Sequence, residues 1–126
     1  MKLVHRSRRQ FGYSKETLAA EYLQSQGLKI IERNYQCRMG EIDLIVRDHS
    51  YLIFVEVRFR SNKLYGSSAE SVDPIKQAKI IRCAQYYLLK NDCSHSQPCR
   101  FDVIGIQNGD TTGSNNIEWI SDAFQA

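Results

Sequence analysis

The stretch that decides the fold is residues 40–60, which reads GEIDLIVRDHSYLIFVEVRFR. Apolar residues dominate both of its ends, and the polar cluster Asp48-His49-Ser50 interrupts them in the middle. This pattern predicts two antiparallel strands, Gly40 to Val46 and Tyr51 to Arg60, joined by a short turn. Side chains of the second strand should alternate, with Ile53, Val55, Val57 and Phe59 on one face and Phe54, Glu56, Arg58 and Arg60 on the other.

Glu56 is unexpected in a strand that is otherwise so apolar. The strand's composition predicts a buried position, where an ionised carboxylate is costly unless it is paired with or bound to a cation. If a four-residue loop joins the strands, Asp43 lies opposite Glu56 and Glu41 opposite Arg58, with the Cβ atoms of each pair about 5 Å apart. Two facing carboxylates repel each other but suit a hard divalent cation such as Mg²⁺. The pair therefore predicts a metal site.

The same residues allow a simpler interpretation, in which Asp43 is an edge-strand charge and Glu56 pairs with Arg58 or Arg38. The metal site also depends on the strand register. A slip of one residue would send Asp43 to the other face of the sheet, and a bulge or a loop of another length would have the same effect.

Outside this hairpin, the sequence predicts helices before and after it, and further strands. Ser14 is a suitable N-cap for a helix over Lys15 to Gln26, which Gly27 would end. Asp73-Pro74 starts a second helix that runs to about Lys90, since an acidic N-cap followed by proline is typical of a helix start. The other elements are a strand from Lys29 to near Asn34, a strand over Arg100 to Gln107, and a strand or helix near Ile117 to Phe124. The order α-β-β-β-α-β plus a short C-terminal element predicts an α/β fold with a mixed sheet flanked by helices.

The net charge of +3 is concentrated at the N-terminus. Lys2, Arg6, Arg8 and Arg9 hold four of the 17 basic residues, which leaves 13 basic against 14 acidic residues, or −1, for the rest of the chain. We therefore interpret residues 1–10 as a basic, flexible tail and residues 11–126 as a single domain. Affinity for phosphate backbones would come from the tail and from local clusters of basic residues.

Nothing in the sequence predicts a membrane segment or a secretory signal, so we expect a cytoplasmic location. The four cysteines, which contain no C-x-x-C pair, are then expected to be reduced. Cys93, His95 and Cys99 could be imagined as zinc ligands, but they lack the paired spacing of structural zinc sites, and a surface loop is the simpler interpretation.

Two further polar residues occupy apolar positions of the expected helices. Gln77 shares a stripe with Ile81 and Leu88, so its amide would point inward or toward a site, although an amide facing solvent fits equally well. Glu16 shares a stripe with Leu23 and could reach a metal. It could also stabilise the positive end of the helix dipole.

Five segments, spread in order over nearly the whole chain, carry a recognisable set of motifs. They are Gly12-x-x-x-Glu16-x-x-Ala19-Ala20-x-Tyr22-Leu23, Gly40-Glu41-Ile42-Asp43-Leu44-Ile45, Phe54-Val55-Glu56-Val57-Arg58, Lys76-Gln77 with Ala84 and Tyr87-Leu88, and Arg100-Phe101-Asp102-Val103. Together they resemble the YraN family of small bacterial proteins. That family is similar to the restriction-endonuclease-like, PD-(D/E)xK nuclease superfamily, close to archaeal Holliday-junction resolvases, and the resemblance implies the same core.

The resemblance also implies roles for individual residues. The superfamily's metal-binding aspartate matches Asp43, its second acid matches Glu56, and the helix acid of some resolvase-like members matches Glu16. Mg²⁺ or Mn²⁺ is the implied cofactor. The glutamine of the following helix matches Gln77 and would be part of the catalytic site. The expected lysine is Arg58, and an arginine stays charged at neutral pH, so it cannot act as a general base but can hold the scissile phosphate.

Our main functional hypothesis is a metal-dependent endonuclease that cuts DNA phosphodiesters, branched or junction DNA included. The alternative is a module that binds nucleic acid or a protein without cutting, its site degraded at Arg58. A structural network of Glu41 with Arg58 and Glu56 with Arg38, without metal, is a third interpretation. The sequence leaves open the choice between DNA and RNA and the formation of a homodimer. The expected nucleic-acid contacts are Arg58, Arg60, Lys63, Lys76, Arg8 and Arg9.

Overall fold

The computed structural model describes residues 15–60, 72–93, 96–107 and 116–126, without the side chains of Arg60 and Asn116. Within these residues the chain forms two helices and one five-stranded sheet with the strand order β1-β2-β3-β4-β5. Neighbouring strands are antiparallel, except that β3 and β4 are parallel. The strands are β1 (Lys29–Cys37), β2 (Gly40–Arg47), β3 (Leu52–Arg60), β4 (Cys99–Gln107) and β5 (Asn116–Phe124). The helix α2 (Pro74–Lys90) connects β3 to β4, and residues 15–25 form the N-terminal helix.

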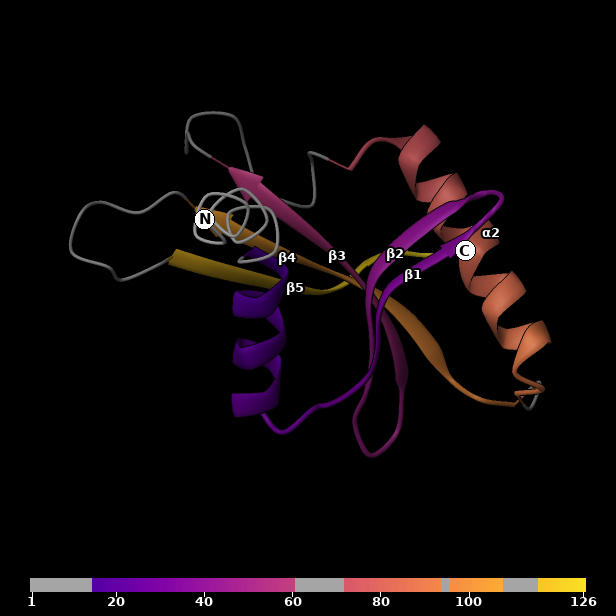
Figure 1. The fold of residues 1–126 in the computed structure, drawn as a ribbon, viewed down its shortest axis with the longest axis horizontal. Coiled ribbons are helices and arrows are strands. Elements are labelled where there is room, and N and C mark those ends of the chain that lie inside the picture. Colours follow the sequence, from indigo (N-terminus) through magenta and orange to yellow (C-terminus); the bar gives the residue numbers. More distant parts are fainter. Residues whose placement is uncertain (1–14, 61–71, 94–95, 108–115) are drawn as a thin grey trace, which may run out of the picture.

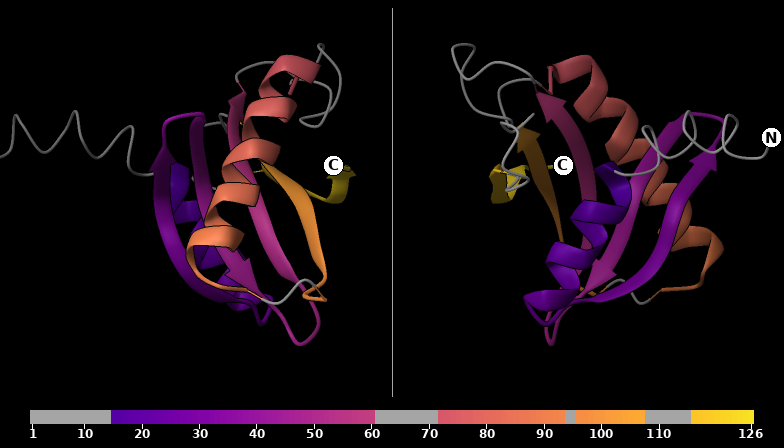
Figure 2. Two further views of the ribbon diagram at one scale, coloured as in Figure 1. Left: turned by 90° about the vertical axis from the view of Figure 1, so that its right-hand side faces the viewer. Right: turned by 60° about the vertical axis from the view of Figure 1, so that its left-hand side comes forward.

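The two helices cover opposite faces of the sheet (Figure 1, Figure 2). Under α2, one buried cluster contains Phe54 and Tyr87. Under the N-terminal helix, a second cluster contains Leu23 and Val55. This arrangement confirms the predicted α/β fold class, a mixed sheet flanked by helices, and is consistent with a restriction-endonuclease-like core. In the described part of the chain, neither helix is long and apolar enough to cross a membrane.

Both faces of β3 are therefore buried over most of its length, which differs from the expected division into an apolar and a charged face. Ile53, Val55 and Val57 share one buried face, as expected, and this face lies under the N-terminal helix. Phe54, on the other face, is buried under α2. The charged character of that face begins only at Glu56. Phe59, expected on the same face as Val55 and Val57, is not in the core but 41% exposed.

The N-terminal helix ends as predicted, at Gly27. Its φ of +94° lies in the left-handed region that glycine adopts without strain. The Leu28 N–H donates to the carbonyl of Leu23, and the Gly27 N–H donates to that of Gln24, both at 3.0 Å. This pair of bonds is a Schellman motif, which satisfies carbonyls that the last turn of a helix leaves without partners. Leu28 and Leu23 share the same buried cluster, so the motif fixes the direction in which the chain enters β1.

The start of α2 confirms the helix start predicted at Asp73-Pro74. The Asp73 carboxylate accepts a hydrogen bond from the Lys76 N–H at 2.8 Å, and Pro74 is the first helical residue. This cap also fixes the position of Lys76, which matters for the site described below. We expect Asp73→Ala to lower the free energy of unfolding by about 1 kcal/mol. Urea denaturation measures it, and Asp73→Asn, which keeps the capping oxygen, should lose much less.

Two elements differ from the sequence prediction or complete it. The first strand was expected to end near Asn34, which is wrong, because β1 continues to Cys37. Asn34 adopts a φ of 52°, which asparagine tolerates better than most residues, and the strand runs on through it. The C-terminal element, for which strand and helix were both open, is the strand β5, which pairs with β4.

The β2–β3 hairpin has the register that the sequence predicted. Leu44 pairs with Val55 and Arg47 with Leu52, and residues 48–51 form the four-residue loop. The Asp48 carboxylate shapes this loop by accepting hydrogen bonds from the backbone N–H groups of Ser50 and Tyr51, at 2.8 and 2.7 Å. The loop length and the register together bring the acids of β2 and β3 to neighbouring positions.

Candidate metal centre

Asp43 on β2 and Glu56 on β3 are both buried, with 6% and 4% of their surface exposed. The paired residues of these strands end at Leu44 and Val55, one position short of the two acids. Beyond that point, the Asp43 carboxylate accepts a hydrogen bond from the Val57 N–H at 2.8 Å. The acids therefore lie where β2 and β3 separate, and the Asp43 side chain takes a donor that strand pairing would otherwise use.

The side-chain alternation of β2 is interrupted at the same place. Ile42 and Ile45 both pack in the cluster under α2, whereas Leu44 packs in the cluster under the N-terminal helix. In a regular strand, residues three apart lie on opposite faces. Opposite this irregularity on β1 stands Asn34, between the paired residues Arg33 and Tyr35, with its left-handed backbone. Both β1 and β2 are therefore locally distorted next to Asp43.

Two cations lie against Glu56. The Arg58 guanidinium donates to Glu56 Oε2 at 3.2 Å, and the Lys76 ammonium of α2 lies 3.7 Å from the same oxygen. Both cationic side chains are partly exposed, 33% and 38%, so solvent weakens their attraction for the carboxylate. Burial, and then the charge of Asp43, raise the pKa of Glu56 to about 7 in spite of these cations. The positive charges of Arg58 and Lys76 therefore do not offset the cost of burying two carboxylates side by side.

The N-terminal helix brings two further charged groups to the acid pair. Burial raises the pKa of Asp43, while the Val57 N–H bond and then the charge of Lys15 act against this. Lys15 also donates to the backbone carbonyl of Val57, at 3.4 Å. Burial and the charge of Asp43 raise the pKa of Glu16, which a hydrogen bond with Asn34 lowers. No sequence pattern pointed to Lys15, because only the docking of the helix on the sheet places this lysine near β2 and β3.

Gln77, expected to point inward or toward a site, holds the chain that enters α2. Its amide nitrogen donates to the carbonyl of Val72 at 2.9 Å. Glu41, expected opposite Arg58, lies beyond the last paired residues of the hairpin and accepts a hydrogen bond from Gln36 at 3.3 Å. Residues 1–10 lie outside the described residues, as do several expected contacts to nucleic acid and one residue of the disfavoured zinc interpretation. These are Arg8, Arg9, Lys63, His95 and the side chain of Arg60.

The donor set at this site consists of two carboxylates. Among the described residues there is no group of three or more His, Cys, Asp or Glu side chains that could hold one ion, so Glu16 does not complete a three-ligand set here. Mg²⁺ is commonly bound by one or two carboxylates, with water and substrate phosphates as the remaining ligands. Two buried, mutually repelling carboxylates fit such an ion by donor type and by charge.

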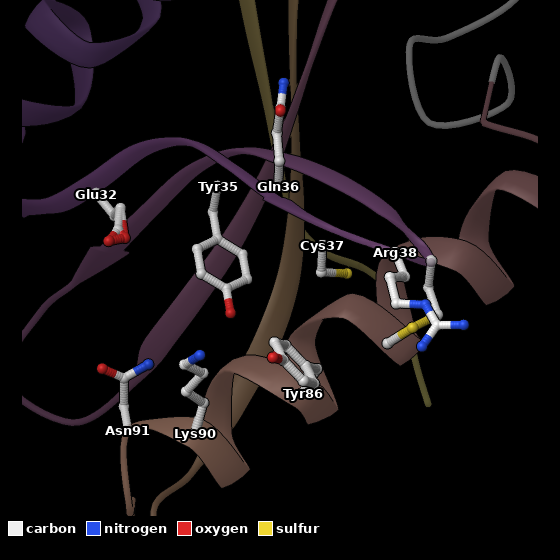
Figure 3. A pocket seen from close by; sticks show the side chains of 9 residues that line it. Glu32, Tyr35, Gln36, Cys37, Arg38, Tyr86, Lys90 and Asn91 are labelled. Carbon is white, nitrogen blue, oxygen red and sulfur yellow. The ribbon is translucent and has the colours of Figure 1, made fainter.

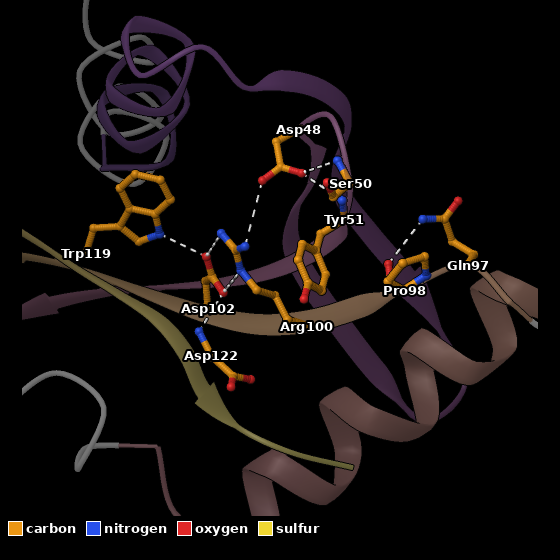
Figure 4. Close-up of polar contacts among 9 residues, drawn as sticks. All are labelled: Asp48, Ser50, Tyr51, Gln97, Pro98, Arg100, Asp102, Trp119 and Asp122. Carbon is orange, nitrogen blue, oxygen red and sulfur yellow. Dashed lines mark hydrogen bonds and ion pairs between the residues drawn. The ribbon is translucent and has the colours of Figure 1, made fainter.

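A third buried acid, Asp102 on β4, is of a different kind (Figure 4). It is fully buried and receives four hydrogen bonds of 2.9–3.2 Å. Two come from the Arg100 guanidinium, one from the Trp119 indole and one from the Asp122 N–H, where β5 has a φ of +55°. Arg100 also lies 3.7 Å from Asp48 and over the ring of Tyr51. Asp102 thus joins β4 to β5 and, through Arg100, to the hairpin loop. Its hydrogen bonds give it a structural role, whereas Asp43 and Glu56 have fewer partners and are the better candidates for binding an ion.

The comparisons with known proteins cover the residues that form this centre. Residues 15–106 match the model of a family described as uncharacterised protein family UPF0102. Similar proteins of that name include one from Lachnoclostridium phytofermentans, 50% identical over 115 residues, which are 91% of this chain and 92% of the relative. One from Nitrosococcus oceani is 46% identical over 90% of both chains. One from Alcanivorax borkumensis is 44% identical over 94% of both. The chain therefore belongs to uncharacterised protein family UPF0102.

Proposed function

We propose that this chain is a divalent-metal-dependent endonuclease that hydrolyses DNA phosphodiesters, a distant member of the PD-(D/E)xK superfamily through its resemblance to the YraN family. One observation carries the proposal. Two buried carboxylates, Asp43 and Glu56, lie at the point where β2 and β3 separate, and burial, followed by the charge of Asp43, raises the pKa of Glu56 to about 7. A cytoplasmic location belongs to the same proposal.

In the proposed site, Asp43 and Glu56 would hold Mg²⁺ or Mn²⁺. When bound, such an ion polarises the phosphoryl oxygen and lowers the pKa of a water molecule. The chain's own cations act on the phosphate. Arg58 and Lys76 touch Glu56 in the free protein, and both are exposed enough to bind phosphodiester oxygens once a substrate is present.

Lysines from two helices supply the amines that the Glu-x-Lys motif lacks at Arg58. Lys76 reaches Glu56 from the start of α2, and Lys15 reaches the Asp43 side of the pair from the N-terminal helix. An ammonium group at either place stabilises negative charge that develops on the phosphate during cleavage. Arg58 as the third residue of the motif is therefore compatible with a cutting enzyme.

A cleavage assay tests this proposal. The purified chain would be incubated with Mn²⁺, with Mg²⁺ or with a chelator, and with linear, flapped and four-way DNA and a matched RNA duplex. We expect cleavage of at least one DNA substrate that requires the metal ion and is lost on chelation. The exposed Glu21 of the N-terminal helix offers a matched control, since Glu21→Gln should cleave like the wild type.

Two results would contradict the proposal. Cleavage that continues at the same rate in chelator would exclude a metal-dependent enzyme. Binding of the DNA panel in a gel-shift assay, without cleavage in either metal, would favour the non-catalytic module. In that case Arg58→Lys becomes informative, because activity gained on this substitution would show a site that has lost cutting at one residue.

A further inference from the structure

Two cysteines from distant parts of the chain meet on the α2 side of the sheet. Cys37 ends β1 and Cys83 lies in the middle of α2, 46 residues later, and their sulfur atoms are 2.7 Å apart. This separation is only about 0.7 Å longer than the S–S bond of a disulfide, about 2.04 Å. Both are free thiols in the structure. The proposed nuclease site uses neither of them.

The two thiols differ in their access to solvent. Cys83 is fully buried, whereas Cys37 is partly exposed. Cys37 also lines a cavity of about 450 Å³ between the end of β1 and α2 (Figure 3). Arg38, Lys90 and Glu32 line the same cavity, so its charged side chains carry one more positive than negative charge, which admits a small anionic reagent. A low-molecular-weight reagent can therefore reach Cys37 first, with Cys83 directly behind it.

The surrounding backbone holds the two sulfurs in place. The Cys37 thiol donates to the Cys83 sulfur, and the Cys83 thiol donates to the carbonyl of Gly40 at 3.7 Å. Gly40 lies directly against α2, because a Cβ atom there would be 3.5 Å from the Cβ of Lys79. The end of β1, the start of β2 and the middle of α2 thus converge on the sulfur pair, and a bond between them requires only a small approach.

We propose that Cys37 and Cys83 are a dithiol that a small disulfide, such as oxidised glutathione, converts to an intramolecular disulfide. The Cys37 thiolate attacks one sulfur of the reagent, which forms a mixed disulfide and releases one glutathione. The Cys83 sulfur then attacks Cys37 Sγ, which breaks the mixed disulfide and releases the second glutathione. The two protein thiols lose two protons and two electrons, and the reagent takes them up as two thiols.

The burial of Cys83 sets the order of these steps. Burial, and then the hydrogen bond with Cys37, raise the pKa of Cys83 to about 12, so at neutral pH it reacts slowly as a thiolate. The second step should therefore be slower than the first. The mixed disulfide on Cys37 should accumulate first and then decay into the intramolecular disulfide.

The experiment uses a full-length background with Cys93→Ser and Cys99→Ser, which removes the other two thiols. After incubation with oxidised glutathione, intact mass spectrometry should show a species with one added glutathionyl group. A second species, lighter than the starting protein by two hydrogen atoms, should then replace it. Because the disulfide closes a long loop, the melting temperature should rise by roughly 5–10 °C and return to its starting value after reduction.

Two variants of the background make the result decisive. With Cys83→Ala, we expect the mixed disulfide on Cys37 to form and persist. With Cys37→Ser, whose residue is partly exposed and tolerates the change, we expect neither product. The proposal is overturned if the mixed disulfide never resolves in the background protein. It is equally overturned if the lighter species also forms in Cys37→Ser, or if Cys37 stays unmodified while a small-molecule thiol of the same concentration reacts fully.

Discussion

Replacement of Glu56 by glutamine is expected to reduce metal-dependent DNA cleavage by about 10³-fold or more, which corresponds to roughly 4 kcal/mol of transition-state stabilisation. Glutamine keeps the size of the side chain but removes the negative charge that would help to hold the ion between β2 and β3. Isothermal titration with Mn²⁺ should show the same loss directly. Glu21→Gln, which changes an exposed acid on the N-terminal helix in the same way, should leave both measurements unchanged.

The same substitution should stabilise the metal-free protein at pH 8. The pKa of Glu56 is about 7 in the folded state against 4.5 for an ordinary glutamate, so the folded state binds this proton more tightly than the unfolded state. The resulting stability is fully present below pH 4.5 and is lost as the pH rises through 7. We expect the wild type to lose about 1–3 kcal/mol of unfolding free energy between pH 5 and pH 8 through this group.

Melting curves in chelator at pH 5 and pH 8 measure this difference. Glu56→Gln should show a smaller loss than the wild type over this range, and added Mn²⁺ should stabilise the wild type at pH 8 but not the variant. Equal pH dependence of the two proteins would show that Glu56 is not destabilised by its burial and by Asp43. Equal stabilisation by Mn²⁺ would show that the ion binds elsewhere.

Asp102→Ala is expected to lower the free energy of unfolding by about 3–5 kcal/mol and the melting temperature by roughly 10–20 °C. The substitution removes an acceptor of four hydrogen bonds from a fully buried position. It leaves the Arg100 guanidinium, the Trp119 indole and the Asp122 N–H without that partner, and unpaired buried polar groups are costly. The distorted backbone of β5 at Asp122 also loses the contact that holds it.

Asp48→Ala is the matched control for this variant. Asp48 also pairs with Arg100, but at 3.7 Å and with 29% of its side chain exposed, so we expect a loss of only about 1 kcal/mol, mostly from its loop. Urea denaturation of both variants compares them on one scale. An Asp102→Ala variant no less stable than Asp48→Ala would show that the four hydrogen bonds of Asp102 contribute little to stability.

The sequence predicted those parts of the fold that depend on neighbouring residues. The caps at Gly27 and Asp73 and the loop of residues 48–51 are set by a few adjacent side chains, and each agrees with the structure. The strand end at Asn34 was wrong because asparagine usually interrupts a strand. Here β1 is an edge strand, where exposed polar residues and a left-handed position are tolerated.

The surroundings of the acid pair could be predicted only in part. The side-chain alternation of β3 and the length of the hairpin loop were enough to predict that Asp43 lies near Glu56. Both can be read from residues that are close together in the sequence. The separation of the strands at Asp43 depends on the Val57 N–H, and the positions of Lys15 and Lys76 depend on how two helices dock on the sheet. The meeting of Cys37 and Cys83 likewise depends on a contact between residues far apart in the chain. Such tertiary contacts leave no periodic signal in the sequence.

The parallel pairing of β3 with β4 has a consequence for the way the chain folds. β1, β2 and β3 are joined by short loops, so these strands can pair through contacts that are near in sequence. β4 can join β3 only after α2 has crossed over, and contacts at such separation slow folding. The two acids of the candidate centre both belong to the early, local part of this order. We therefore expect the two acids to come together before the helix that carries Lys76 has docked on the sheet, at a stage when the attraction of Lys76 for Glu56 is still missing.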